Sequence, residues 1–352
     1  MLLIFRVFVI IYKIISHNKM DIAAFSDEQL AGQRLMVGFD GTELDKELMF
    51  LVNTLKVGGI ILFAGNLSNE DQIKQMCFSV QDYTRSCGQP PLFIAIDQEG
   101  GQVSRLGEPF TRFPGNPKMK GKEDAVRFAR VTAAELKEVG INMNLAPVLD
   151  VVPKGVDSVM SGRAFGYDPM RVSELGVAVI EHLQESKIMS VAKHFPGIGR
   201  TKLDSHVEMP ALDIDVKAME STDLVPFEAA IKHEVSGIMV SHILYKKVDS
   251  EWPASLSTTI TGDILRRRMG FEGIIMTDDL DMGAIKKHYN IKTVIRQILL
   301  ADIDMALICH KGPDIENAFV EILNTLGSSK SQMAKGTESV KRIVKLKRQY
   351  LL

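Results

Sequence analysis

KEDAVRFARVTAAELKEVGINMNLAPVLDV, residues 122–151, contains the structural unit from which the rest of the fold can be predicted. Its first part, 122–140, places apolar residues at helical spacing and ends at Gly140, a residue type common just after a helix. Its second part, 142–151, is a short, mostly apolar run that includes Pro147 and Asp150. Runs of this kind suit strands that are buried on both faces. The stretch therefore predicts a helix followed by a buried strand.

The same alternation continues on both sides of this stretch. Helical spacing recurs at 172–186 and 223–234. Short apolar runs that predict strands occur at 33–39, 58–63, 92–97, 142–151, 190–195, 236–242, 273–279 and 304–309. Eight strands alternating with helices predict an α/β protein, a single-domain (β/α)8 barrel with a closed parallel sheet. An open doubly wound sheet is the alternative, but GFDGTELD (38–45) lacks the glycine-rich phosphate turn typical of that fold.

The ends of the chain need separate interpretations. Residues 338–352 form a basic segment that predicts a helix closing the outside of the barrel. Residues 1–16 are mostly apolar but include Arg6 and Lys13, so they do not reach the length of a clean spanning helix. Three interpretations remain open: a start assigned upstream of a true Met20, a weakly membrane-associating helix, or an unusual export signal. We treat 1–19 as a poorly defined extension and 20–352 as the barrel.

Composition excludes several classes of protein. Apolar residues make up 45% and charged residues 24%, which is the usage of a globular domain. A net charge of −2 gives no electrostatic reason to expect a nucleic-acid partner. Cys77, Cys87 and Cys309 have no metal-type spacing, and an odd number of cysteines fits a reducing compartment. Contact with a membrane is predicted only through 1–16, and the sequence sets no oligomeric state.

Ionisable residues follow six of the predicted strands. In a parallel barrel the carboxyl ends of the strands share one mouth, where buried polar groups indicate a site rather than a core. The strand-end groups are Asp97, Asp150, Lys193 with His194, His242, Asp278 with Asp279, and His310.

Two stretches contain the candidate catalytic residues. In KHFPGIGRTKLDSHVEMP (193–210), Asp204 and His206 lie two residues apart on a loop rich in glycine and proline. A carboxylate beside an imidazole raises the basicity of the ring, and such a pair can transfer a proton near neutral pH. In MTDDLDMGAI (276–285), Asp278 is a strand-end carboxylate that could attack an anomeric carbon if a partner protonates the leaving oxygen.

These stretches resemble blocks of the family 3 glycoside hydrolases, specifically the single-domain β-N-acetylglucosaminidases. The resemblance begins near residue 26 and covers nearly the whole chain, with seven blocks in family order. The blocks are GGIILFAGNL (58–67), AIDQEGGQVSRL (95–106), NMNLAPVLDV (142–151), SGRAFG (161–166), AKHFPGIG…DSH (192–206), SHILYKKVDSEWPASLS (241–257) and MTDDLDMGA (276–284). One departure is Ile198, a position that often carries a polar or basic residue in such enzymes.

The resemblance implies a role for each matching position. Asp278 is expected to be the nucleophile, His206 the acid/base, and Asp204 the partner that orients it. The expected sugar-binding residues are Asp97, Arg105, Arg163, Lys193 and His194. The implied reaction is removal of terminal β-linked N-acetylglucosamine (GlcNAc) by double displacement, without a cofactor or metal. The implied substrates are peptidoglycan fragments in which GlcNAc is linked to anhydro-N-acetylmuramic acid, recycled in the cytoplasm of a Gram-negative bacterium.

Other interpretations of the same residues stay open. Strand-end aspartates often cap the next helix, and Lys193 with His194 could be a buried structural pair. Asp150 could mainly support loops, and His242 could lie behind the site. The protein could also be a metal hydrolase, in which His194 and His242 would bind one metal ion together with Asp204 and His206. The rival functions are a β-glucosidase or a GlcNAc phosphorylase of the same family, and a non-catalytic sugar-binding barrel.

Overall fold

The computed structural model describes residues 20–352 except 204 and 206. Eight parallel strands close into a barrel in which each strand pairs with the strands before and after it. The barrel strands are β1 (Leu35–Val37), β2 (Gly59–Leu62), β3 (Phe93–Ile96), β6 (Met143–Asn144), β7 (Met189–Phe195), β9 (Gly237–Val240), β11 (Ile274–Asp279) and β12 (Met305–Ile308). Seven of them lie within a predicted run and β7 begins one residue before its run, so the closed barrel is confirmed and the open sheet is wrong.

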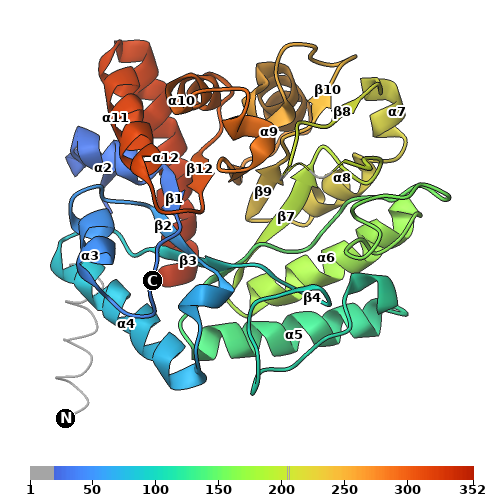
Figure 1. Cartoon of the computed structure of the whole chain (residues 1–352), viewed down its shortest axis with the longest axis horizontal. Coiled ribbons are helices and arrows are strands. Elements are labelled where there is room, and N and C mark those ends of the chain that lie inside the picture. Colours follow the sequence, from blue (N-terminus) through green and yellow to red (C-terminus); the bar gives the residue numbers. More distant parts are fainter. Residues whose placement is uncertain (1–19, 204, 206) are drawn as a thin grey trace.

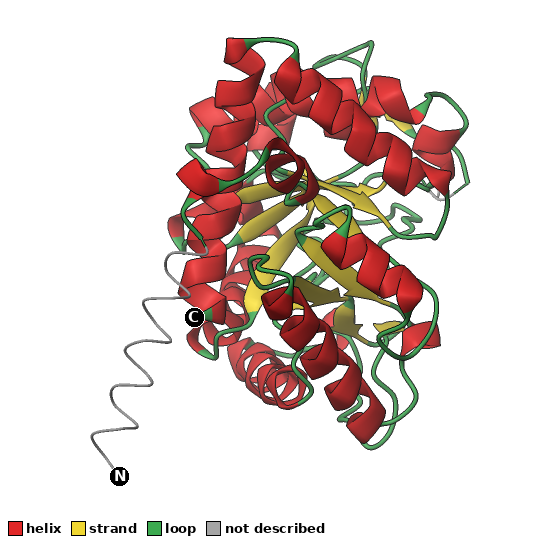
Figure 2. Cartoon of the chain, turned by 90° about the vertical axis from the view of Figure 1, so that its left-hand side faces the viewer, coloured by secondary structure: helices red, strands yellow, loops and turns green. Residues whose placement is uncertain are grey.

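Helices surround the strands on the outside (Figure 2). The α-helices are α2 (Asp27–Gly32), α3 (Lys46–Asn53), α4 (Glu70–Ser86), α5 (Lys122–Glu138), α6 (Pro169–Glu185), α7 (Val216–Glu220), α8 (Val225–Lys232), α9 (Gly283–Lys286), α10 (Ile291–Leu300), α11 (Pro313–Gly327) and α12 (Lys330–Leu351). Short 3-10 helices are η1 (Ile22–Ala24), η2 (Ala64–Asn66), η3 (Asn116–Lys118) and η4 (Ala254–Leu256), and η5 (Thr258–Arg268) is a π-helix. Two small sheets pair β4 (Gln98–Gly100) with β5 (Val103–Ser104), and β8 (Ala211–Leu212) with β10 (Leu244–Tyr245).

The stretch that opened the sequence analysis folds as a helix followed by a strand. Helix α5 ends at Glu138, and Gly140 has a φ of 82°, the left-handed conformation that favours glycine after a helix. Strand β6 is shorter than predicted and pairs regularly only over two residues. Beyond it, Pro147 has no amide hydrogen to donate, and the chain stays beside β7 through a single bridge between Val148 and Lys193.

Apolar side chains form two packed layers. The larger layer lies between the strands and the outer helices, and the smaller one fills the inside of the barrel. The inner layer includes Met36, Phe93 and Met143 and also receives Ile343 and Leu346 from α12. Helix α12 begins eight residues before the predicted basic segment (Figure 1), and its packing against the inner layer extends its role beyond covering the outside.

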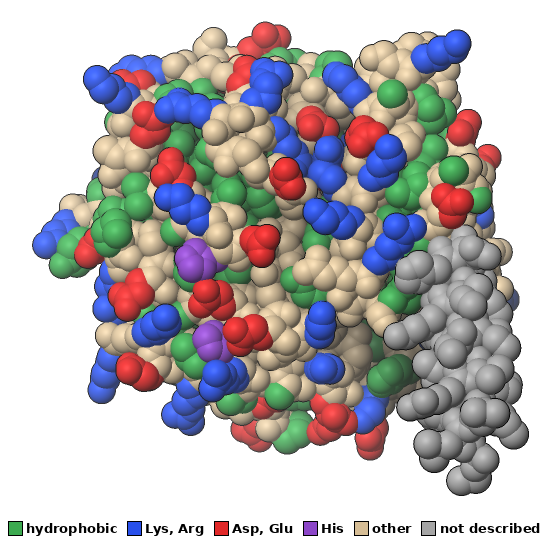
Figure 3. All heavy atoms as spheres, turned by 180° about the vertical axis from the view of Figure 1, so that it is seen from behind, with side chains coloured by type: hydrophobic (Ala, Val, Ile, Leu, Met, Phe, Trp, Pro, Cys, Tyr) green, Lys and Arg blue, Asp and Glu red, His purple; other side chains and the backbone are tan. Residues whose placement is uncertain are grey.

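The surface is mixed in charge. Figure 3 shows lysine and arginine side chains interspersed with aspartate and glutamate over the face opposite to that of Figure 1. Among residues 20–352 without 204 and 206, no helix combines the length and apolar content needed to cross a membrane. The extension at 1–19, on which the three N-terminal interpretations depend, lies outside the described residues.

Candidate active site

The mouth of the barrel holds a pocket of about 370 Å³ at the carboxyl ends of the strands. Its floor is apolar and consists of inward-facing side chains from four strands or their ends, namely Ile61, Leu145, Met239 and Leu307. Above that floor, the pocket is lined by all five predicted sugar-binding residues, Asp97, Arg105, Arg163, Lys193 and His194, and by Asp278. The structure therefore brings Asp97 and Asp278, which lie 181 positions apart in the chain, to the same pocket.

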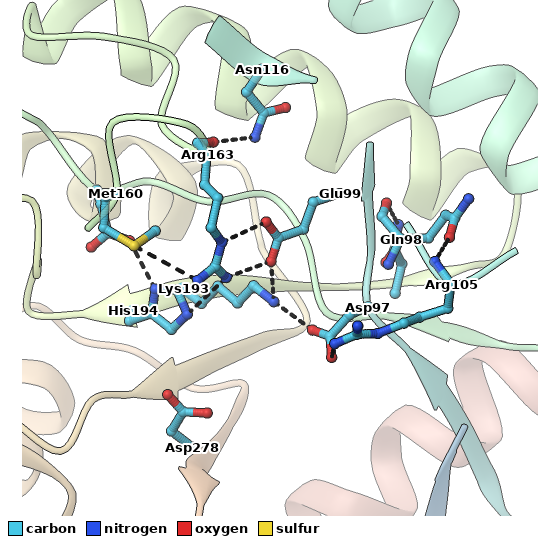
Figure 4. Close-up of polar contacts among 12 residues, drawn as sticks. Asp97, Gln98, Glu99, Arg105, Asn116, Met160, Arg163, Lys193, His194 and Asp278 are labelled. Carbon is cyan, nitrogen blue, oxygen red and sulfur yellow. Dashed lines mark hydrogen bonds and ion pairs between the residues drawn. The ribbon is translucent and has the colours of Figure 1, made fainter. Parts of the chain in front are cut away.

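A buried ionic cluster forms one side of the pocket (Figure 4). Lys193 Nζ lies 2.6 Å from Asp97 Oδ1 and 2.6 Å from Glu99 Oε1. Arg163 binds Glu99 through two hydrogen bonds, of 3.0 Å from Nε and 2.7 Å from Nη2. Arg105 lies farther away, 3.6 Å from Asp97 Oδ2. We call Asp97, Glu99, Arg105, Arg163 and Lys193 the site cluster.

Opposite charges keep the site cluster ionised despite its burial. Burial alone would raise the pKa of Asp97 and of Glu99, but the nearby Lys193 outweighs it, so that both pKa values lie below their ordinary range. Conversely, burial alone would lower the pKa of Lys193, yet Asp97 and Glu99 raise it above its usual value. The wall of the pocket therefore carries fixed charged donors and acceptors.

Glu99 is a site residue that the sequence analysis missed. Its side chain is 1% exposed and holds both Arg163 and Lys193 in place. Its position in the sequence could have identified it. Glu99 lies in β4, two residues after Asp97, and so belongs to the same group of residues that follow β3.

Asp150 supports His194 from behind the pocket. Its carboxylate is fully buried, and Oδ2 lies 2.8 Å from His194 Nδ1 while Oδ1 accepts a 2.7 Å hydrogen bond from the Ile198 amide. The ring orientation of His194 and the start of the following loop are thus fixed by one side chain. The prediction that Asp150 supports loops agrees with this geometry, which adds the contact to His194.

Asp278 ends strand β11 and faces the site cluster and His194 across the pocket (Figure 4). Its side chain is only partly covered, and Oδ1 accepts a 2.9 Å hydrogen bond from the Asp279 amide. Burial acts to raise the pKa of Asp278, but His194, His242 and the Asp279 amide together lower it. The group is therefore a carboxylate at neutral pH, the form that a nucleophile requires.

The neighbours of Asp278 have supporting contacts. Asp279 Oδ1 accepts hydrogen bonds from the amides of Asp281 and Cys309. His242 lies behind β11, where its ring nitrogens contact Ser255 Oγ at 2.7 Å and the Asp279 carbonyl at 2.9 Å. Through the second contact, His242 supports the end of β11 beside Asp278. His310 is a loop residue whose side chain is 74% exposed.

The loop with the predicted acid/base is only partly described, because Asp204 and His206 lie outside the described residues. Ser205, which lies between them in the chain, lines the pocket. Its carbonyl accepts a hydrogen bond from the Ala284 amide, just beyond Asp278, and the Val207 carbonyl accepts one from Lys287 Nζ. Ser205 therefore lies at the pocket, beside the segment that follows Asp278.

A family model, the glycosyl hydrolase family 3 N-terminal domain, matches residues 27–346. The chain belongs to glycosyl hydrolase family 3. This confirms the family that the sequence blocks indicated, on the barrel fold they implied.

Known family 3 proteins resemble the chain over most of its length. A β-hexosaminidase of Nitrosomonas eutropha is 37% identical over 285 residues, which cover 78% of this chain and 80% of that protein. The β-hexosaminidase A of Pseudoalteromonas piscicida is 34% identical, with coverage of 91% of this chain and 60% of that protein. A solved family 3 β-N-acetylglucosaminidase from Paenibacillus sp. superimposes with a TM-score of 0.89 at 32% identity, over 93% of this chain and 63% of that one. The chain thus spans about three fifths of the length of two of these three relatives.

Proposed function

We propose that the protein is a retaining exo-β-N-acetylglucosaminidase. The observation that carries the proposal is Asp278, an ionised and partly uncovered carboxylate that faces Lys193 and His194 across a pocket closed at its base. The names of the family 3 relatives, β-hexosaminidase and β-N-acetylglucosaminidase, support this choice of sugar.

The proposed reaction has two displacements. Asp278 attacks the anomeric carbon and forms a glycosyl ester, while the bond to the leaving oxygen breaks and His206 gives that oxygen its proton. His206 then takes a proton from water, whose oxygen attacks the anomeric carbon and releases Asp278 and the sugar. Asp204 would orient the His206 ring. The roles of these two loop residues rest on the sequence, and the position of Ser205 at the pocket supports them.

The shape of the pocket supports action at a chain end. The apolar floor formed by Ile61, Leu145, Met239 and Leu307 leaves no continuation of the pocket through the barrel. A sugar held there by the site cluster can be extended only toward the mouth, so that one terminal residue is removed at a time. In keeping with the resemblance, we propose muropeptide fragments with GlcNAc on anhydro-N-acetylmuramic acid as substrates and the cytoplasm as the place of action.

The test is hydrolysis of 4-nitrophenyl β-N-acetylglucosaminide against the matching β-glucoside by the full chain. We expect clear preference for the acetamido sugar, with the β-anomer released first in proton NMR spectra. Activity on the glucoside alone would favour the β-glucosidase. Release of GlcNAc-1-phosphate in phosphate buffer would favour the phosphorylase, and binding without turnover would favour the non-catalytic barrel.

A further inference from the structure

We infer that Phe63 is a positioning residue for sugar binding, because its aromatic ring holds the Arg105 guanidinium at the pocket. The ring takes the place of the close carboxylate contacts that hold Arg163 and Lys193. The inference rests on the proposed function, since it assumes that Arg105 binds the terminal sugar. It adds to the site a residue whose side chain carries no polar group.

Arg105 is the least firmly held cation of the site cluster. Arg163 makes two hydrogen bonds to Glu99, and Lys193 Nζ lies 2.6 Å from each of two carboxylates. Arg105 Nη2, by contrast, lies 3.6 Å from Asp97 Oδ2, which is beyond hydrogen-bonding distance. The Arg105 Nε atom is buried and has no hydrogen-bond partner among the described residues. Hydrogen bonds to carboxylates therefore do not fix the direction of this guanidinium.

The ring of Phe63 is a second close neighbour of the Arg105 side chain. Arg105 Cζ lies over this ring, 5.5 Å from its centroid. Attraction between a guanidinium and an aromatic face acts within about 6 Å and strengthens where water is excluded. Unlike a hydrogen bond to a carboxylate, it occupies none of the N–H groups of the guanidinium. These groups therefore stay available as donors to a bound sugar.

Phe63 is itself held in place. It directly follows β2, lines the pocket and is partly exposed. Its amide donates a 2.9 Å hydrogen bond to Oδ1 of the buried Asn66, whose Nδ2 donates to two carbonyls of the chain that follows β1. The ring packs against the inner layer of the barrel, and the His310 ring lies at 18° to it with centroids 6.5 Å apart. The support for Arg105 thus exists before a sugar binds, which lowers the cost of ordering the guanidinium.

A positioning role predicts which kinetic constant responds. Arg105 is expected to contact the sugar both before and during the reaction, and the nucleophile Asp278 belongs to a different strand end. Loss of the Phe63 ring should therefore weaken binding of the sugar and leave the chemical steps nearly unchanged. KM and the inhibition constant of the released sugar should rise, while kcat should stay near that of the parent.

The experiment replaces Phe63 with leucine, which is apolar but has no ring. We expect Phe63→Leu to raise KM for 4-nitrophenyl β-N-acetylglucosaminide and the inhibition constant of free GlcNAc by about fivefold, with kcat within about twofold of the parent. Phe63→Tyr keeps the aromatic face and should keep both constants within about twofold of the parent. The matched control is Phe78→Leu, at a 50% exposed phenylalanine of α4 outside the pocket, which should change neither constant.

A double-mutant cycle shows whether Phe63 acts through Arg105. Arg105→Met removes the guanidinium and should by itself raise KM by about tenfold. In that background Phe63→Leu should change KM by less than about twofold, because the ring no longer has a cation to position. Thermal unfolding shows that each variant is folded. If Phe63→Leu does not fold, Phe63→Met, which also lacks a ring, replaces it in the cycle.

Several results would overturn the inference and leave the proposed function intact. They are an unchanged KM in Phe63→Leu, an equal rise of KM in Phe63→Leu and Phe63→Tyr, or a full effect of Phe63→Leu in the Arg105→Met background. The last of these would mean that the ring contacts the sugar directly. Absence of turnover of every β-N-acetylglucosaminide by the parent would instead refute the proposed function, and the role of Phe63 with it.

Discussion

Two buried ionic clusters lie at opposite ends of the barrel. The site cluster stands at the carboxyl ends of the strands, while a second group surrounds Asp304, directly before β12 begins at Met305. We call Asp304, Arg266, Arg342 and Ser339 the lower cluster. Both pair a carboxylate with arginines, and Arg266 and Arg342 also line hollows at their end of the barrel, but Asp97 itself lines the pocket at the mouth whereas Asp304 is fully buried.

The two clusters differ in how many acceptor positions of their carboxylates are occupied by hydrogen bonds. Asp304 Oδ1 accepts from Ser339 Oγ at 2.6 Å and Arg342 Nε at 2.8 Å, and Oδ2 accepts from the Ile275 amide and Arg266. Asp97 has one close partner, Lys193, while Arg105 lies 3.6 Å away and the side chain is 14% exposed. Asp97 thus retains acceptor capacity toward the pocket, and Asp304 does not. The same residue types thus leave acceptors open at the pocket and fill them at the other end of the barrel.

The largest expected effect lies outside both clusters. Asp278→Asn removes the nucleophile and should lower kcat by at least about a thousandfold. Since Asp278 has few partners in the fold, the melting temperature should change little. The measurement is a steady-state assay with 4-nitrophenyl β-N-acetylglucosaminide beside thermal unfolding. Full activity in this variant would remove Asp278 from the mechanism.

Lys193→Met is expected to harm both activity and stability. It leaves Asp97 and Glu99 without their shared cation, which should cost about 3–5 kcal/mol in the free energy of unfolding. Loss of a charged hydrogen-bond partner near the sugar should lower kcat/KM by about 10- to 100-fold. Denaturant unfolding and kinetics on the same samples check both numbers. Lost stability with unchanged kcat/KM would make the site cluster purely structural.

Acidification tests the same variant. The folded-state pKa values of Asp97 and Glu99 are lowered, so their stabilisation is present above the ordinary pKa of about 4 and disappears as the pH falls through the lowered values. Without Lys193 the effect of burial is less opposed, so both pKa values should rise. The loss of stability that these two groups cause on acidification should therefore be smaller in Lys193→Met than in the parent, as melting temperatures from pH 3 to 7 would show.

Asp304→Asn should affect stability alone. The substitution removes the charge shared by Arg266 and Arg342 and should cost about 3 kcal/mol in the free energy of unfolding. At temperatures where the variant is folded, kcat/KM should stay within about twofold of the parent, since the lower cluster lies away from the pocket. A large loss of kcat/KM in folded protein would break the proposed division between the clusters.

Ser339→Ala should give the smallest effect. It removes one hydrogen bond, from Ser339 Oγ to Asp304 Oδ1, while the other three partners of Asp304 remain. We expect a loss of about 1 kcal/mol in the free energy of unfolding and no change in kinetics. Chemical denaturation measures the first value. A loss as large as that of Asp304→Asn would mean that Ser339 holds the whole lower cluster together.

The sequence predicted the strands better than the contacts between distant charges. Buried parallel strands produce apolar runs such as 273–279, and a residue at the end of a run, such as Asp278, must face the mouth. The five residues that the sequence analysis predicted to bind sugar do line one pocket. Their proposed roles remain predictions until the variants are measured.

Other features depend on contacts that no local pattern contains. The spacing of Glu99 after Asp97 places it near the strand ends, but its contacts with Arg163 and Lys193 join residues far apart in the sequence. Asp304 and Ser339 are 35 residues apart and meet because α12 packs against β11, the neighbour of β12 in the barrel. The full length of α12 was also missed, since its first turns include Gly336 and Thr337, residues of low helix propensity.

Closure of the barrel has a consequence for biogenesis. Strand β1 ends at Val37, yet one of its two neighbours is β12, which begins at Met305. A chain growing from the ribosome therefore exposes an unpaired edge of β1 until nearly the whole domain has been synthesised. Helix α12 follows later still and binds the start of the described chain through a hydrogen bond from Arg348 to the Met20 carbonyl. Chaperone protection during synthesis should thus matter most for the first strand, long after it leaves the exit tunnel.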